Sequence, residues 1–351
     1  MKNFKFLLFA LIASTITLQS CNSDDDTPTT AQTGDYHEGI FVLNEGAMGS
    51  NNAEVTFFKN GTVTQNIFRT VNPSQTLGNV ATSMHFDDDK GYIVVNLSNK
   101  IEVVDENTFR SVGTIASNLN NPRYIASDDQ NIYVTNWGDA SNPNDDFIAV
   151  FRKADLGFVK KIEVIEGPDQ ILVENNQLVI AHSGGWSNGN SVSIYNLNSN
   201  TLNNVVVGDV PSALVKEDGF VYVLCSGVTW GGDASPGKLV QLNLATHSVA
   251  KTLNFSEGQN PRFLVEENDQ LYYTLNGAVY KLSTQATTLP TTPLFNSNAT
   301  YIYSFEIINN AIYIGDAKDF ASNGEVQYYS LVGNRLGSFS TGIGPNFIIK
   351  N

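Results

Sequence analysis

Residues 121–164 decide the fold, and they read NPRYIASDDQNIYVTNWGDASNPNDDFIAVFRKADLGFVKKIEV. The stretch contains four short apolar runs, at 124–126, 132–135, 147–151 and 158–164. Clusters of Asp, Asn and Gly, which favour turns, separate the runs. The pattern predicts one unit of four antiparallel β-strands.

The same pattern recurs along the chain, with a head residue that is often Pro and an apolar pair ten and eleven residues later. The heads are Thr82, Pro122, Pro168, Pro211, Pro261 and Ile302, at spacings of 40, 46, 43, 50 and 41 residues. A period of about 40 to 50 residues that is built from strands alone is typical of a β-propeller.

The first repeat is incomplete. Residues 39–68 contain runs for the last three strands of a unit (IFVLN, AEVTFF and VTQNIF), and no run that matches the first. Residues 344–349 repeat the head 43 residues after Ile302, and the repeat then stops. We therefore expect an all-β fold over residues 39–351. It is a seven-bladed β-propeller with four antiparallel strands per blade, in which a C-terminal strand completes the first blade and leaves no open sheet edge.

The N-terminal segment predicts export and lipidation. Residues 1–20 combine Lys2 and Lys5 with an apolar run at 6–16 that is too short to span a bilayer, which is typical of a signal peptide. Leu-Gln-Ser before Cys21 resembles a bacterial lipobox, which implies that Cys21 is lipidated; the alternative is an ordinary signal peptide followed by an incidental Cys.

Residues 21–38 have almost no apolar content at their start, so we expect a flexible tether. The acidic run at 24–26 resembles the signal that sends Bacteroidetes lipoproteins to the cell surface, and the alternative is a solvated linker. The predicted location is the outer membrane, lipid-anchored and exposed on the cell surface. The net charge of −15 and the pI of about 4.6 argue against nucleic acid as a partner and against membrane contact other than through the lipid.

The long loops predict a binding face. Loops between second and third strands lie on the same face as the connections between blades, and those at 44–52, 136–146, 182–190, 226–238 and 316–325 are extended. All three tryptophans, Trp137, Trp186 and Trp230, fall in these loops among Gly, Asn and Ser. We predict that they contact a ligand; the alternative is that each fills a gap between blades.

Aligned residues at the end of the second strands are predicted to line the mouth of the channel. Of these, Asn44, Asn136, His182 and Asp316 are candidate ligand contacts. Asp139 and Asp233 follow Gly in two of the long loops; turn chemistry explains such pairs, and calcium binding is the alternative.

The four histidines show no metal-ligand spacing, and no catalytic motif is present. We therefore predict no metal, no cofactor and no enzymatic activity. A metal-dependent hydrolase of the lactonase type stays open, because Asp316 with Glu45 beside it offers carboxylate ligands.

Two stretches resemble known families. The tetrapeptide Tyr133–Asn136, at its place in the repeat, resembles the bacterial YVTN β-propellers. Residues 41–53 are similar to a pattern in surface propeller lipoproteins of Bacteroidetes, a group that includes corrinoid-binding propellers of cobalamin uptake. The resemblance implies a surface solute-binding lipoprotein that captures a small-molecule ligand, with a corrinoid such as cobalamin as the named candidate, for a TonB-dependent outer-membrane transporter. A scaffold that binds a protein or glycan is the alternative.

Overall fold

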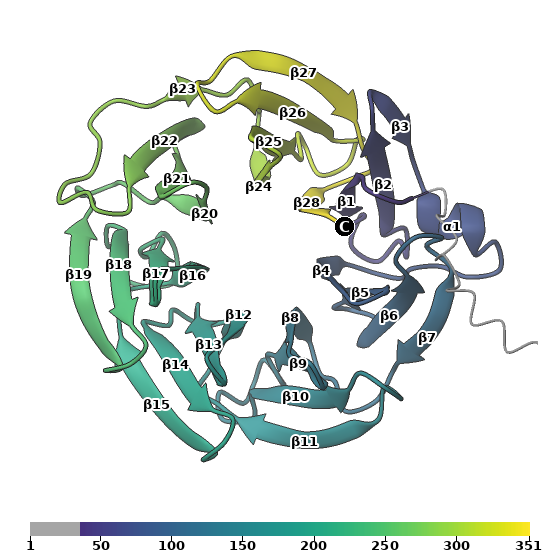
Figure 1. Ribbon diagram of the computed structural model, residues 1–351, viewed down its shortest axis with the longest axis horizontal. Coiled ribbons are helices and arrows are strands. Elements are labelled where there is room, and N and C mark those ends of the chain that lie inside the picture. The colour runs from purple at the N-terminus through teal and green to yellow at the C-terminus, as the bar shows by residue number, and fades with distance from the viewer. Residues whose placement is uncertain (1–35) are drawn as a thin grey trace, which may run out of the picture. The chain divides into compact units, whose positions relative to one another are not determined.

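A computed structural model describes residues 36–351, which form seven four-stranded antiparallel sheets arranged as a ring (Figure 1). The predicted all-β class, the seven blades and the completion of the first blade by the C-terminal strand are confirmed. The predicted signal peptide, Cys21 and the acidic run at 24–26 lie outside the described residues. No helix among residues 36–351 is long and apolar enough to cross a membrane.

Each blade is a sheet whose strands follow one another from the channel outward. Blade one contains β28 (Pro345–Lys350), β1 (Ile40–Asn44), β2 (Glu54–Lys59) and β3 (Thr62–Thr64). Blade two contains β4 (Ala81–Asp87), β5 (Lys90–Val95), β6 (Lys100–Asp105) and β7 (Ser111–Ile115). Blade three contains β8 (Pro122–Ser127), β9 (Asn131–Asn136), β10 (Phe147–Arg152) and β11 (Phe158–Glu163). Blade four contains β12 (Pro168–Glu174), β13 (Gln177–His182), β14 (Ser191–Asn196) and β15 (Thr201–Val206).

The remaining three blades repeat the same order. Blade five contains β16 (Pro211–Glu217), β17 (Phe220–Cys225), β18 (Lys238–Asn243) and β19 (Ser248–Asn254). Blade six contains β20 (Arg262–Glu266), β21 (Gln270–Leu275), β22 (Ala278–Ser283) and β23 (Phe295–Asn296). Blade seven contains β24 (Ile302–Ile308), β25 (Ala311–Asp316), β26 (Glu325–Ser330) and β27 (Arg335–Ser340).

The hydrophobic core lies between the blades. Alternate residues of a strand point to opposite faces of its sheet. On β13, Leu178 and Ile180 therefore pack toward blade three, while Val179 and Ala181 pack toward blade five. Because both faces of each blade are covered in this way, the central strands are buried almost throughout, which explains their apolar runs.

Two segments differ from the sequence-based expectation. The run VTQNIF was expected to form the outer strand of blade one, but β3 stops at Thr64 and a short helix, α1 (Ile67–Val71), follows. The apolar pair Ile67–Phe68 begins this helix and is buried against the boundary of blades one and two. Tyr36 lies within the expected tether at 21–38, and its ring packs edge-on against Phe57 and is buried.

Candidate ligand-binding face and central channel

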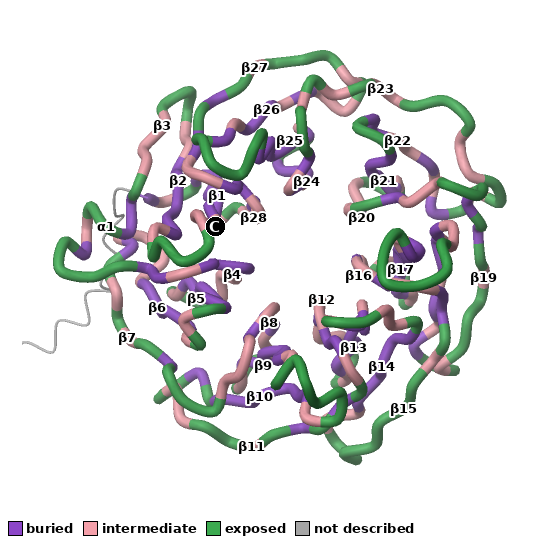
Figure 2. The backbone as a smooth tube through the Cα atoms, turned by 180° about the vertical axis from the view of Figure 1, so that it is seen from behind, coloured by how far each residue is buried: buried purple, intermediate pink, exposed green. Residues whose placement is uncertain are grey.

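The loops between second and third strands are exposed on one face of the ring, which Figure 2 views. Three neighbouring loops on this face carry the tryptophans: residues 137–146 join β9 to β10, residues 183–190 join β13 to β14, and residues 226–237 join β17 to β18. Because blades three, four and five are consecutive, the repeat brings together residues that are far apart in the sequence.

The three tryptophans lie in loops that contact one another. The side chain of Trp186 is 54% exposed and that of Trp230 is 60% exposed, so neither fills a gap between blades. Trp137 is partly buried, and its ring meets that of Trp186 edge-on with 5.8 Å between centroids. The carboxamide of Asn188 donates to the backbone oxygen of Trp230 at 3.2 Å, which joins the third loop to the second. Two large aromatic rings are thus held at the surface in mutually contacting loops.

Trp137 is held in place by the blade beneath it. Its indole N–H donates to the backbone oxygen of Pro168 at 3.1 Å, and the guanidinium of Arg123 lies over its ring, 3.9 Å from the centroid. Arg123 in turn pairs with Asp169 at 3.3 Å. A cation over an aromatic face is favourable, and the ion pair orients it. Trp137 therefore acts as a fixed support for the more exposed Trp186.

The tight approach of the second loop to its neighbour requires glycine. Gly167 has a φ of +69°, and a Cβ atom at this position would lie 2.2 Å from the backbone of Gly184. A Cβ on Gly185 would lie 3.4 Å from the ring of Trp137. Glycine adopts positive φ at little cost and allows two backbones to meet. The Gly-rich sequence of this loop thus places Trp186 against Trp137.

The two predicted aspartates of the loops lie at the exposed surface. The carboxylate of Asp139 accepts the backbone N–H of Ser141 at 2.9 Å and its hydroxyl at 2.7 Å. These two hydrogen bonds hold the pKa of Asp139 below its ordinary value, and they are typical of an Asx turn. Asp233 is exposed near the tip of the loop that carries Trp230. Turn chemistry accounts for Asp139, and the role of both residues in ligand binding stays a prediction.

Four other predicted contacts lie in the interior: Asn44, Asn136, His182 and Asp316. Each ends the second strand of its blade, and the innermost strand lies between it and the channel. The prediction that they line the mouth of the channel is therefore wrong. Alignment of the repeats shows that these residues are equivalent, but it does not show which strand of a blade borders the channel. Their role in ligand binding stays a prediction.

Hydrogen bonds explain why polar residues recur at this buried position. The Asn136 carboxamide oxygen accepts the backbone N–H of Asn120 at 2.8 Å. The Asp316 carboxylate accepts the N–H groups of Thr300 and Tyr301, each at 2.9 Å. His182 bonds to Ser193 at 2.7 Å, and burial lowers the pKa of its imidazole to about 4. Asn136 and Asp316 thus fasten the incoming connection to its blade, as buried polar groups must find partners.

A different set of aligned residues lies on the innermost strands, near the long-loop face: the residue directly after each blade head. In blade two the structure pairs Ala81 with the end of the second strand, as it pairs Pro122 in blade three, so Ala81 and not Thr82 occupies the head position. The residues after the heads are therefore Thr82, Arg123, Asp169, Ser212, Arg262, Tyr303 and Asn346. They connect neighbouring blades: Thr82 donates to the backbone oxygen of Arg123 at 3.0 Å, and Asn346 donates to that of Ala81 at 2.7 Å. This set was not predicted from the sequence. The repeat does contain a simple signal for it, since each member directly follows a head residue, which is often Pro.

A second aromatic group lies on the same face, at blades six and seven. Tyr301, Tyr303 and Phe320 contact one another with 4.8 to 6.1 Å between ring centroids. Arg262 donates to the hydroxyl of Tyr301 at 3.1 Å, and the hydroxyl of Tyr303 donates to Glu45. Burial is the main cause that raises the pKa of Glu45 above its ordinary value. The long-loop face thus has aromatic groups beside both Arg123 and Arg262.

Inside the ring, the innermost strands enclose a cavity of about 600 Å³. Its lining comes from β8, β12, β16, β20, β24 and β28, with His85 from β4. This volume lies within the range of small-molecule sites, which is about 300 to 1,000 Å³. The channel is therefore large enough to admit part of a ligand.

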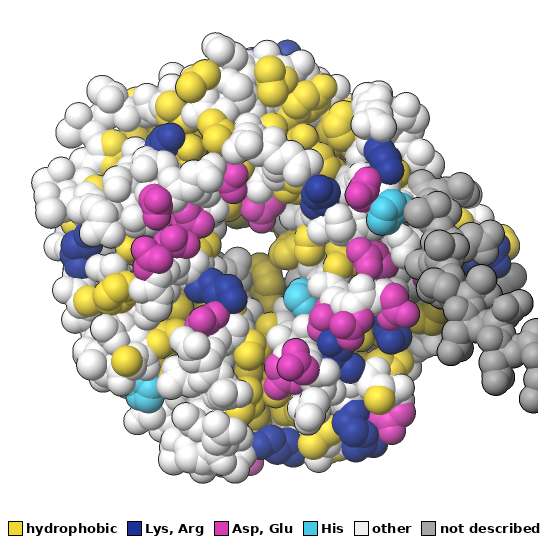
Figure 3. All heavy atoms as spheres, viewed as in Figure 1, with side chains coloured by type: hydrophobic (Ala, Val, Ile, Leu, Met, Phe, Trp, Pro, Cys, Tyr) yellow, Lys and Arg dark blue, Asp and Glu magenta, His cyan; other side chains and the backbone are white. Residues whose placement is uncertain are grey.

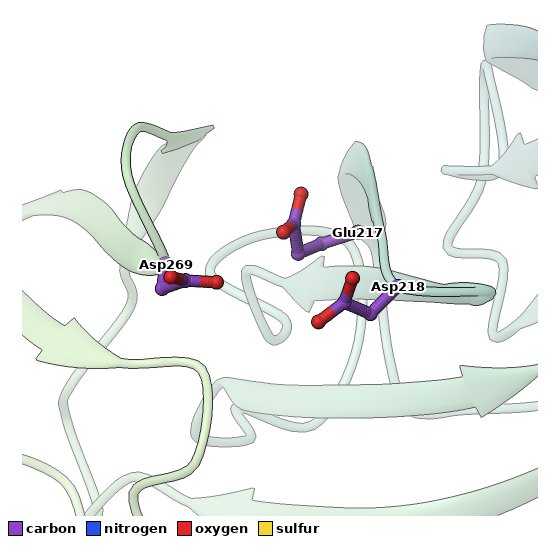
Figure 4. Close-up of side chains that lie close together, drawn as sticks. All are labelled: Glu217, Asp218 and Asp269. Atoms are coloured by element: carbon purple, nitrogen blue, oxygen red, sulfur yellow. The ribbon is translucent and has the colours of Figure 1, made fainter.

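The opposite face carries the short turns between first and second strands (Figure 3). There, carboxylate oxygens of Glu217, Asp218 and Asp269 lie within 4.8 Å of one another, on the turns that join β16 to β17 and β20 to β21 (Figure 4). Partial burial and the neighbouring carboxylates raise the pKa of Glu217. Carboxylates are ligands that calcium accepts, but exposed turns often carry such groups without an ion.

Comparison with known proteins places the chain in a family and a fold. A family model described as a domain of unknown function (DUF5074) matches residues 38–328. No curated protein matches the sequence.

Solved structures of other propeller proteins are similar in fold. A quinonprotein alcohol dehydrogenase-like protein from Bacteroides thetaiotaomicron has a TM-score of 0.68 at 15% identity, over 90% of this chain and 78% of that one. The hydrazine synthase of Kuenenia stuttgartiensis has a TM-score of 0.59 at 17% identity, over 74% of this chain and 86% of that one. BamB from Moraxella catarrhalis has a TM-score of 0.56 at 12% identity, over 91% and 92%. Identities this low show the fold alone, so no activity follows from these names.

Proposed function

We propose that this chain, which belongs to the family described as a domain of unknown function (DUF5074), is a binding protein whose ligand docks on the long-loop face. The observation that carries the proposal is the pair of exposed tryptophans, Trp186 and Trp230, in loops that contact each other. Large aromatic side chains at a surface give contact area at a low entropic cost, and they are enriched where proteins bind ligands or partners.

The chemistry of the face favours a large ligand with both apolar and polar groups. Trp186 offers an apolar ring, while the loops around it are rich in Gly, Asn and Ser, whose amides and hydroxyls form hydrogen bonds. Arg123 and Asp169 add one charge of each sign on the innermost strands, so the site does not select by net charge alone. The second aromatic group beside Arg262 supports a ligand wide enough to extend across the face.

A corrinoid is the ligand we propose first. It combines an apolar macrocycle face with many amide groups, which are the two chemistries that this face can satisfy. The reason for naming it is the resemblance of residues 41–53 to surface propeller lipoproteins of Bacteroidetes, a group that includes corrinoid-binding members. We further propose that the lipid on Cys21 anchors the chain at the outer-membrane surface, where it passes its ligand to a TonB-dependent transporter.

Cobalamin is the probe that tests this proposal. The purified protein is incubated with cobalamin, desalted and examined by its visible absorption spectrum, and titration calorimetry gives the affinity. We expect retained colour, and a loss of at least about 1 to 2 kcal/mol of binding free energy in W186A and in W230A, as for aromatic hot spots. F158A is the matched control, because Phe158 is 40% exposed and lies on the outer strand β11. Colourless protein, or equal losses in F158A, would contradict the proposal.

A scaffold that binds a protein or a glycan is the second candidate, because the same exposed aromatic loops suit a macromolecular partner. Binding of such a partner that weakens in W186A, with no cobalamin retained, would favour it. The hydrolase alternative would need a metal near Asp316, whose carboxylate already accepts backbone N–H groups. Hydrolysis that a chelator abolishes would favour that alternative.

A further inference from the structure

The middle of the channel is apolar with two exceptions. The fourth residue after each blade head lines the cavity at this level in six blades: His85, Ala126, Leu172, Val215, Val265 and Glu306. Four of these six side chains are aliphatic. A ligand that enters to this depth must therefore bring an apolar body, since burying an unpaired polar group is costly.

His85 and Glu306 differ in their hydrogen-bond partners and in their charge near neutral pH. The Nε2 atom of His85 bonds to the Ser127 hydroxyl at 2.8 Å, and burial lowers the pKa of its imidazole, so His85 is neutral near pH 7. Glu306 accepts one backbone N–H, that of Ile307, at 2.9 Å. The pKa of Glu306 is raised to about 7, mainly by burial, and further by the charge of Glu267. Glu306 is therefore a carboxyl group that gains its charge near neutral pH.

Among the described residues, no cation forms an ion pair with Glu306. Lys350 on β28, which packs against β24, donates to the side-chain oxygen of Asn309 at 3.3 Å. Glu266 and Glu267 on and after β20 carry the same charge sign, and His85 on β4 is neutral. Lys216 on β16 lines the cavity, but its ammonium pairs with Glu174 at 2.8 Å. A carboxylate in an apolar cavity is stabilised most by a positive charge brought next to it.

The entrance on the short-turn face also favours cations. The turns between first and second strands and the strand ends beside them carry carboxylates at 87–89, 128–129, 174, 217–218, 266–267 and 269. In Figure 3 acidic side chains gather on both sides of the central opening on this face. Of the lysines nearby, Lys90, Lys153 and Lys216 are paired with carboxylates, and Lys350 donates to the side-chain oxygen of Asn309 at 3.3 Å. A mouth of one charge sign raises the local concentration of the opposite ion and speeds its entry.

We propose that the central cavity is a second binding site, distinct from the long-loop face, for an organic amine with an apolar body. The ligand enters from the acidic short-turn face, its hydrocarbon part lies against Leu172, Val215 and Val265, and its ammonium group pairs with the carboxylate of Glu306. The site stands on the cavity, on the aliphatic side chains at its middle and on the Glu306 carboxyl group among them, and it does not depend on the proposed function of the long-loop face.

The test compares three probes of one shape: hexylamine, hexan-1-ol and hexanoate. Titration calorimetry at pH 7.5 should show that hexylamine binds about tenfold tighter than hexan-1-ol or more, since charge-assisted hydrogen bonds exceed neutral ones. Hexanoate should not bind. In the isosteric variant E306Q the advantage of the amine over the alcohol should fall below about threefold, while the alcohol binds as before. Thermal melting checks that the variant is folded.

Control variants separate the site from the general acidity of the face. D129N removes the same charge from an exposed turn of the short-turn face, so hexylamine affinity should change less than about threefold. W186A should bind hexylamine as the wild type does, although it is expected to lose cobalamin. Between pH 5.5 and 7 the affinity of the wild type for hexylamine should rise with pH as Glu306 ionises, and that of E306Q should stay flat.

Three results would overturn the proposal. The first is equal affinity of the wild type for the amine and the alcohol. The second is an unchanged preference for the amine in folded E306Q. The third is binding of calcium chloride that requires Glu306 when no amine binding is seen, because the carboxyl would then belong to a metal site.

Discussion

Removal of residues 344–351 should unfold the propeller, because this segment contains the strand that closes the ring. In the structure β28 pairs with β1 from Ile40 opposite Lys350 to Asn44 opposite Pro345. Asn346 donates to the backbone oxygen of Ala81 on blade two at 2.7 Å, and Ser304 on blade seven donates to that of Pro345 at 2.7 Å. One strand thus joins the last blade to the first two.

The loss of stability follows from what the strand buries. Ile348 is 3% exposed and packs at the boundary of blades seven and one, so its burial contributes about 1.5 to 3 kcal/mol. Phe347 and Ile349 are partly buried against the neighbouring core and add about 1 kcal/mol each. The sum of about 3.5 to 5 kcal/mol is comparable to the lower end of the typical free energy of unfolding of a folded domain, about 5 to 15 kcal/mol. The deletion also leaves the backbone of β1 as an unpaired edge.

A circular permutant provides the matched control. Lys350 lies opposite Ile40, so joining Asn351 directly to Gly39 makes a two-residue Asn-Gly hairpin, which is a favoured turn. Opening the chain between Ile343 and Gly344 then keeps every strand. The permutant lacks the covalent link from β27 to β28 and also lacks residues 1–38, among them the buried Tyr36. Denaturant unfolding followed by circular dichroism, with gel filtration, should show an aggregated or unfolded deletion and a folded permutant. A deletion that unfolds cooperatively at the wild-type midpoint would refute the reasoning.

Three further perturbations have expected outcomes that follow from exposure, titration and anchoring. W186A and W230A should each lower the free energy of unfolding by less than about 1 kcal/mol, because both side chains are exposed. W137A should lower it by about 2 to 3 kcal/mol, because Trp137 is partly buried and bonded to Pro168. Denaturant unfolding that gives the reverse order would contradict this. Folding raises the pKa of Glu306 to about 7, so the wild type should lose up to about 3 kcal/mol of stability as the pH rises from 4.5 to above 7. E306Q should lose less between pH 5 and pH 8, as denaturant unfolding would measure. Equal losses of stability in the two proteins would contradict the prediction. C21A should be released from the membrane fraction with its propeller folded, as fractionation and circular dichroism would show; continued membrane association would contradict this. Replacement of residues 24–26 by Ala should keep the protein anchored but reduce its cleavage by protease added to intact cells. Unchanged cleavage would contradict the second prediction.

The sequence by itself determined the strands, their grouping and the closure of the ring. Strand runs and turns are local features: alternation of apolar side chains and clusters of Asp, Asn and Gly are visible in a few residues. The head at Gly344-Pro345 can be recognised because it repeats the blade pattern 43 residues after Ile302, and the first repeat lacks a first strand. The helix α1 was missed because the pair Ile67–Phe68 is apolar in either conformation, and its burial beside blade two decides between them.

Only the tertiary structure decided which aligned residues meet a ligand and which hold the blades together. The repeats align Asn136 and His182 correctly, but the innermost strand covers this position, so both side chains are buried. The residues after the heads, Arg123 among them, lie on the innermost strands instead. Glu306 has no local signal at all: its environment is the apolar lining that five other strands supply across the axis. The exposure and the pKa of a side chain depend on atoms that folding brings together from distant blades. The spacing of residues along the chain does not give the distances between those atoms.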